Sequence, residues 1–305
     1  MTTFGEMTSQ VQAHLRSFVR DQEQSTHLVK SIGLGDDKLY VADATLVSRG
    51  RIEIDNELIW VDKMNRSENS LEIPPYGRGM DGTDANEHSA GTRVVISPLY
   101  PRKFLQDTLN QVIRQMGSTL YGVEVLTDDQ GKQPLTRDDG GFTYEVPDFV
   151  RDVLSVTVND PDWNDDSVTY LRDWTFDKNA PQSVSSTGRA LYLYDDWIPG
   201  DLELTITVSR DPIVLTGEGQ FFSETTLPSS SEDIPVLGAA ARLLASSDSY
   251  SVQTRAVEAA TISSKVPVGA AQEQSKYLQA LFVSRLDEER LRLLNTHNTR
   301  SRYQR

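Results

Sequence analysis

The sequence predicts an α+β protein in which a helical bundle carries two inserted antiparallel β modules. The hydrophobic period along the chain alternates between about 3.6 and 2 residues, in the order helix, β, helix, β, helix, helix. The length of 305 residues is too great for one small core and suggests two or three domains. Five short strands within about sixty residues indicate a small antiparallel barrel or sandwich.

The bundle is expected to combine residues 1–35, 99–119 and 232–297, because helices this short need each other's apolar faces to be stable. The tripeptide Asp233-Ile234-Pro235 is typical of a helix start, where proline is tolerated. Each helix is defined by apolar residues at helical spacing: Met7, Val11, Leu15 and Phe18; Leu105, Leu109, Val112 and Met116; Val236, Leu237, Ala240, Leu243 and Leu244; Tyr277, Leu278, Leu281, Phe282, Leu286 and Leu293.

Two segments have the period of β-strands. Residues 36–98 hold the five short strands, with turn signals at Asp55-Asn56 and Glu68-Asn69, and form the small β module. Residues 120–215 hold longer strands, of which the last, Leu202 to Val208, alternates strictly and therefore buries one face. A β-sandwich is expected there.

Charge is distributed unevenly along this acidic chain. The whole sequence has a net charge of −15, and residues 119–215 hold 19 acidic and seven basic residues, a net charge of −12. The segment 285–305 instead carries six arginines against three acids, and residues 298–305 form a basic tail. Because affinity for DNA comes mainly from cations that neutralise phosphates, the sequence argues against a protein that grips DNA, while a surface past which DNA slides stays open.

Composition argues against several kinds of functional site. The chain has no cysteine and only four dispersed histidines, so no metal site, cofactor or catalytic set is expected. No apolar run approaches the ~20 residues of a membrane span, and the N-terminal residues lack the pattern of a signal peptide. His88 lies in a polar loop, where a hydrogen-bonded turn residue is the expected role.

Two motifs resemble ligand loops and are better explained otherwise. Residues 77–82 match G-x-G-x-x-G, but a nucleotide fingerprint needs a helix next, and a polar stretch and a strand follow instead. A hairpin loop with glycines at positive φ is expected. Residues 159–166 have alternating carboxylates, but counting from Asp160, the sixth and twelfth positions of a calcium loop hold Asp165 and Leu171. A solvated acidic loop is expected there.

Two groups of residues remain candidates for binding. Five aromatic residues of the second β segment could stack on sugars, although core packing is the favoured explanation, since alternation would bury about half of them: Trp163, Trp174, Tyr192, Tyr194 and Trp197. Basic residues at the end of the last helix and in the tail, with one aromatic anchor, form a candidate arm that docks on an acidic partner or on a neighbouring copy: Arg290, Arg292, Arg300, Arg302, Tyr303 and Arg305.

Residues 76–94, Tyr-Gly-Arg-Gly-Met-Asp-Gly-Thr-Asp-Ala-Asn-Glu-His-Ser-Ala-Gly-Thr-Arg-Val, resemble a hairpin motif of tailed-bacteriophage virion proteins. Glu57 to Val61 resembles its usual partner strand. Residues 234–245, followed by a long helix that bears arginines, are similar to the C-terminal half of phage head-to-tail adaptor proteins. These motifs cover about a third of the chain, and the acidic segment 120–215 has no counterpart in the resemblance.

The resemblance implies a non-enzymatic structural protein, made in the host cytoplasm and located in the neck of the virion. It implies a homo-oligomeric ring, dodecameric as the family suggests, beneath the portal protein and above a tail-side neck or stopper protein. Viral DNA would pass through the ring without sequence-specific contact, and no membrane is involved. The alternatives are a tail or baseplate component whose β-sandwich binds host glycan and, less favoured, a carboxylate-based glycosidase.

Overall fold

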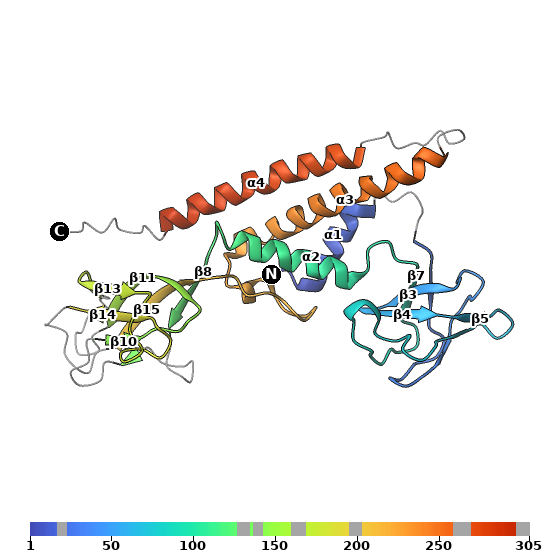
Figure 1. The fold of residues 1–305 in the computed structure, drawn as a ribbon, viewed down its shortest axis with the longest axis horizontal. Helices are drawn as coiled ribbons and strands as arrows, with labels where there is room; N and C mark the ends of the chain where they lie inside the picture. The colour runs from blue at the N-terminus through green and yellow to red at the C-terminus, as the bar shows by residue number, and fades with distance from the viewer. Residues whose placement is uncertain are drawn as a thin grey trace. The chain divides into compact units, whose positions relative to one another are not determined.

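The computed structural model describes residues 1–16, 23–126, 135–136, 143–159, 169–194, 203–258 and 270–296. In this part of the chain, four α-helices and four antiparallel sheets are present, and none of these sheets closes into a barrel (Figure 1). The predicted α+β class is confirmed, and the barrel form considered for the small β module is wrong. The chain divides into two compact units: residues 1–3, 112–234 and 282–305 form unit 1, and residues 4–111 and 235–281 form unit 2.

The four helices occur where hydrophobic periodicity predicts them. They are α1 (Phe4–Arg16), α2 (Arg102–Met116), α3 (Ile234–Glu258) and α4 (Ala270–Thr296). Met7, Val11 and Leu15 of α1 are buried, as are the four apolar residues that define the stripe of α2. Phe18, which was expected to extend the first stripe, lies outside the described residues.

The small β module in unit 2 consists of two open sheets that share one core. Their orders are β1-β7-β3-β4 and β2-β6-β5. The strands are β1 (Ser25–His27), β2 (Lys38–Tyr40), β3 (Gly50–Ile54), β4 (Glu57–Val61), β5 (Lys63–Asn65), β6 (Ser70–Glu72) and β7 (Arg93–Ile96). Leu28 and Ile32 belong to the shared core together with Ile52, Ile59 and Leu71. This core therefore includes residues that precede the expected boundary at residue 36, where the sequence was assigned to the bundle.

A buried carboxylate connects the small β module to the start of α2. Glu53 of β3 is only 4% exposed, and its Oε1 accepts a hydrogen bond from the backbone N–H of Arg102, the first residue of α2. The guanidinium Nε of Arg102 donates to Asn56 Oδ1 at 3.2 Å. A negative charge at a helix N-terminus satisfies free backbone N–H groups and interacts favourably with the helix dipole.

The acidic segment in unit 1 also forms open sheets around one core. Their orders are β12-β11-β15-β8, with β9 also pairing with β15, and β10-β14-β13 (Figure 1). The strands are β8 (Gly122–Leu126), β9 (Leu135–Thr136), β10 (Thr143–Glu145), β11 (Val150–Asn159), β12 (Thr169–Tyr170), β13 (Trp174–Asp177), β14 (Ala190–Leu193) and β15 (Glu203–Arg210). Leu204, Ile206 and Val208 of β15 are buried in the core, as the alternation predicts.

Candidate functional site

The most unusual side chain of the small β module is Glu57, a fully buried carboxylate at the start of β4. An ionised group removed from water is strongly destabilising unless it is paired and fully hydrogen-bonded. Oε1 accepts hydrogen bonds from Arg78 Nε at 2.6 Å and from the backbone N–H of Gly79 at 3.1 Å. Oε2 accepts from Arg78 Nη2 at 2.9 Å and from the backbone N–H of Asn86 at 3.1 Å.

His88 completes this group and lies between two carboxylates. Its Nε2 is 2.9 Å from Glu57 Oε2, and its Nδ1 is 2.8 Å from Asp55 Oδ2. Both ring nitrogens can donate only in the protonated imidazolium. Burial acts to lower the pKa of His88, but the hydrogen bonds to Glu57 and Asp55 outweigh it and raise that pKa above its ordinary value. We call Asp55, Glu57, Arg78 and His88 the buried charge cluster; Asp55 is its outer member, with a side chain that is 62% exposed.

The same partners determine the protonation state of Glu57. Burial alone would raise the pKa of this carboxyl, but hydrogen bonds from His88 and Arg78 and from the backbone of Asn86 lower it to about 2. Glu57 is therefore ionised at neutral pH. Its two oxygens together accept five hydrogen bonds, so the carboxylate has little capacity left to act as a general base.

The buried charge cluster fixes the loop between β6 and β7 against the rest of the small β module. Arg78 donates from Nη1 to the carbonyl of Gly33 at 2.9 Å and from Nη2 to that of Asn86 at 2.6 Å. The backbone of His88 pairs with Ile32 through two hydrogen bonds of 2.9 and 3.1 Å. Three separate segments are thus held by one network, which indicates a structural role.

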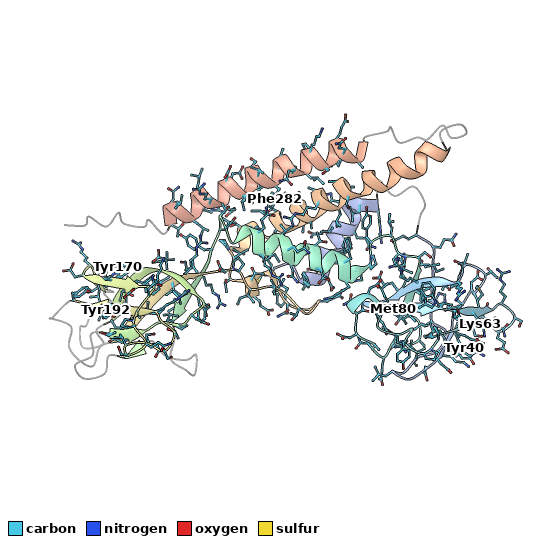
Figure 2. All side chains as sticks on the ribbon, viewed as in Figure 1. Tyr40, Lys63, Met80, Tyr170, Tyr192 and Phe282 are labelled. Atoms are coloured by element: carbon cyan, nitrogen blue, oxygen red, sulfur yellow. The ribbon has the colours of Figure 1, made fainter. Side chains whose placement is uncertain are left out.

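The glycine motif at residues 77–82 belongs to this loop. Gly79 and Gly82 have φ values of 62° and 80°, which confirms for these two residues the predicted hairpin loop with positive φ. Only a single 3-10 turn, η1 (Met80–Gly82), follows the first glycines, and Met80 is labelled in Figure 2. No helix opens there to face a phosphate, and the next regular element is β7.

A second charge group joins the start of α3 to the C-terminal half of α4 in unit 1. Arg285 donates from Nε and Nη2 to the two carboxylate oxygens of Asp233, at 2.9 and 3.3 Å. It also donates to Glu288 at 2.6 Å and to the carbonyl of Ser230 at 3.0 Å. Hydrogen bonds to Asp233 and Glu288 raise the pKa of the guanidinium. Buried Glu289 accepts from the Ser230 hydroxyl at 2.7 Å, so this arginine hub holds α4 in place.

Replacing Arg285 with lysine is expected to lower the free energy of unfolding of unit 1 by about 1–2 kcal/mol. A lysine ammonium cannot reproduce the bidentate contact with Asp233 while it also reaches Ser230. Urea denaturation followed by circular dichroism measures the loss. Arg290→Lys is the matched control, because Arg290 is exposed and has no ion pair within the described residues, and it should unfold like the unmodified protein. Equal stability of all three proteins would contradict a structural role for the hub.

The predicted docking arginines fall into two groups. Arg290 is exposed on α4, and Arg292 is exposed while its Nη1 lies 3.4 Å from Glu289 Oε1. Neither is needed to complete the core of unit 1, so both remain accessible to a partner. The other four predicted residues lie outside the described part of the chain: Arg300, Arg302, Tyr303 and Arg305.

The aromatic residues considered for sugar stacking are divided between core and surface. Trp174 packs against the core of the acidic module. Tyr192, labelled in Figure 2, is half-buried, and Tyr194 is 60% exposed at the end of β14. Trp163 and Trp197, together with the acidic loop 160–166, lie outside the described residues. The structure therefore leaves Tyr194 as the exposed member of this set that it describes.

The end of α2 borders a cavity of about 460 Å³ in unit 1. Its lining residues are Arg114, Gly117, Ser118, Arg151, Asp211 and Pro212. Arg151 donates from Nη1 to the Gly117 carbonyl at 2.7 Å and lies 3.9 Å from Asp211. This arginine therefore satisfies a carbonyl at the C-terminal end of α2, as cations commonly do there. The described residues contain no group of three or more His, Asp or Glu side chains placed to hold a metal ion.

The sequence analysis missed both charge groups. The signals were present: Glu57 begins an otherwise apolar strand, and Arg285 and Glu289 are four residues apart on a predicted helix. Neither signal identifies the distant partners, Arg78 and Asp233, because those contacts depend on the fold.

Comparison with known proteins returns no match, either to a family model or to a curated protein sequence. Among the helices that the structure describes, none combines the length and the apolar character needed to cross a bilayer.

Proposed function

We propose that this protein is a structural component of a tailed-phage virion: a homo-oligomeric ring beneath the portal that connects capsid to tail. The observation that carries the proposal is the buried charge cluster, because it lies within the virion-type hairpin motif. Glu57 of the resembling strand binds Arg78 and His88 of the resembling hairpin, so the two parts of the motif contact each other directly in this chain. The proposed role is non-enzymatic.

The distribution of helices supports the same function. Each of α1 and α2 buries an apolar stripe, and Ser275 of α4 donates to the Ala241 carbonyl of α3 at 2.7 Å. We propose that the helices form the bundle that the sequence predicts and that this bundle is the ring's scaffold. Adjacent copies in a closed ring contact each other through two different surfaces, which a rigid scaffold would hold at a fixed angle. The net charge of −15 would keep passing DNA from binding.

The proposed partners are the portal protein on the capsid side, a neck or stopper protein on the tail side, and further copies of the chain. The arm that docks on the portal would consist of Arg292 at the end of α4 and the basic tail, residues 298–305. A variant that lacks residues 295–305 should lose most of its binding to purified portal rings in a sedimentation assay. Full binding by this truncated variant would show that the arm is dispensable.

A charge-matched pair of substitutions separates docking from general electrostatics. Arg292→Ala is expected to weaken portal binding, whereas Arg114→Ala removes one exposed positive charge from α2 and should leave binding unchanged. Electron microscopy of the portal mixed with the unmodified protein should show an added ring. Absence of any added density would count against the connector function itself.

One specific observation supports the alternative function, which is binding of a host glycan. Tyr194 is 60% exposed and directly follows β14, the central strand of the sheet β10-β14-β13, and its aromatic face could stack on a sugar. Binding on a glycan array that is lost in Tyr194→Ala would favour a tail or baseplate component. An unchanged signal, or no signal, would favour the connector.

A further inference from the structure

One exposed surface of the small β module combines apolar anchors with carboxylates. Tyr76 is 95% exposed and Leu34 is 59% exposed. The segments that carry them run alongside each other, since Ile73 N donates to the Asp37 carbonyl at 2.7 Å and Arg78 Nη1 donates to the Gly33 carbonyl at 2.9 Å. Exposed Asp36 and Asp37 add negative charge. We call Leu34, Asp36, Asp37 and Tyr76 the acidic anchor patch.

The backbone holds Tyr76 in a fixed and unfavourable conformation. Its φ of 65° lies in the left-handed region, which costs a non-glycine residue on the order of 1 kcal/mol. The next residue fixes the loop on both sides: Gly77 N donates to the Pro74 carbonyl at 2.9 Å, and the Gly77 carbonyl accepts from Trp60 N at 2.7 Å. A large aromatic side chain is thus presented to solvent on a rigid support, and it would lose little entropy on binding.

A second exposed surface, on the C-terminal half of α4, has the complementary character. Leu291 is 62% exposed and Leu294 is 41% exposed, and a spacing of three residues places them on one face. Arg290 is exposed beside them and has no ion pair within the described residues. The buried residues Glu289 and Leu293 occupy the opposite face. We call Arg290, Leu291 and Leu294 the basic helix end.

We propose that the basic helix end of one copy binds the acidic anchor patch of a second copy, with Tyr76 packed between Leu291 and Leu294. This inference rests on the proposed ring and names the contact between its neighbours. The charges are complementary only in this pairing, since pairing either surface with itself would bring like charges together. Two different surfaces on each copy give a head-to-tail contact, which repeats around a closed ring. Tyrosine is also among the residues enriched at the centres of interfaces.

The absence of cysteine from the sequence makes a direct test possible. Single variants Tyr76→Cys and Leu291→Cys are prepared separately, mixed at high protein concentration with and without portal rings, and oxidised. The expected result is a cross-linked product that contains one copy of each variant. Tyr170→Cys is the control in place of Tyr76→Cys, because Tyr170 is 64% exposed but lies in the acidic module. Its mixture with Leu291→Cys should yield several-fold less product.

The outcomes distinguish the contact from the function. Mixed cross-links at the level of the Tyr170 control, both with and without portal, would overturn the contact even if the protein binds portal. A dominant product between two Leu291→Cys copies would also overturn it, in favour of pairing between α4 helices. Mixed cross-links in a protein that never binds portal would support the contact and remove the connector function.

A charge exchange supplies a second readout. Asp37→Arg should weaken self-association by about two- to five-fold, as expected for an exposed ion pair, and adding Arg290→Asp in the same chain should restore it. Sedimentation velocity measures both variants. If the double variant associates more weakly than Asp37→Arg alone, because the effects of the two substitutions simply add, the pairing of these two residues is overturned.

Discussion

Replacing Glu57 with glutamine is expected to destabilise the small β module by about 3–5 kcal/mol, because breaking a buried ion pair leaves uncompensated charge behind. The amide replaces one carboxylate oxygen with an NH2 group that cannot accept hydrogen bonds. Arg78, whose side chain is 11% exposed, and buried His88 would then lose their anionic partner. Hydrogen exchange of the amides of β3 and β4 reports on this module alone and measures the change.

The matched control for this experiment is Glu68→Gln. Glu68 also forms an ion pair, with Lys38 at 2.8 Å, but its side chain is 54% exposed. Exposed pairs contribute little, so the amides of β3 and β4 in this variant should exchange at nearly the rates of the unmodified protein. Similar exchange rates in the two variants would show that the buried charge cluster does not stabilise the module.

The second large effect is a loss of stability at alkaline pH that depends on His88. The folded state raises the pKa of this imidazole above 6.5, so the protonated ring contributes its full stabilisation below about pH 6.5. That contribution is lost as pH rises through the folded-state pKa, because the neutral ring can no longer donate to both Asp55 and Glu57.

Urea denaturation between pH 6 and pH 9.5 tests this expectation. In the unmodified protein, the midpoint for the small β module should fall with rising pH, whereas in His88→Gln it should be lower at pH 6 and nearly constant. At acid pH, Glu57 has the opposite effect. Folding lowers the pKa of its carboxyl from 4.5 to about 2, so the stability that the ionised carboxylate contributes is lost as pH falls from about 4.5 to about 2. A pH dependence that is identical in His88→Gln would assign the alkaline loss to other groups.

Much of the fold could be predicted because the spacing of apolar residues along the sequence reflects which side chains are buried. The four helices and the five strands expected in the small β module all occur, since each has apolar residues at the spacing of its period. Strands β1 and β5 were missed, because Ser25–His27 and Lys63–Asn65 are short and almost entirely polar. They are held as strands by pairing with β7 and β6, which is information that the local sequence does not contain.

The candidate site could be predicted only in part. The sequence correctly predicts His88 as a hydrogen-bonded loop residue, but it does not indicate that the side chain is buried between two carboxylates. The reason is that Asp55 and Glu57 lie more than thirty positions earlier and meet His88 only after the hairpin folds. Arg285 illustrates the same limit, because a basic residue on a helix is usually solvated, whereas this one binds Asp233 across 52 positions of sequence.

The discontinuous composition of the two units has a consequence for biosynthesis. Unit 2 needs residues 235–281 in addition to residues 4–111, and unit 1 needs residues 282–305. A nascent chain that has emerged only as far as residue 230 therefore holds the strands of both modules but lacks helices that complete each unit. Multidomain proteins often fold from the N-terminus during synthesis. In this protein, the ribosome must pass residue 281 before either unit can reach its native state, and chains released from ribosomes stalled before that point should be sensitive to proteases.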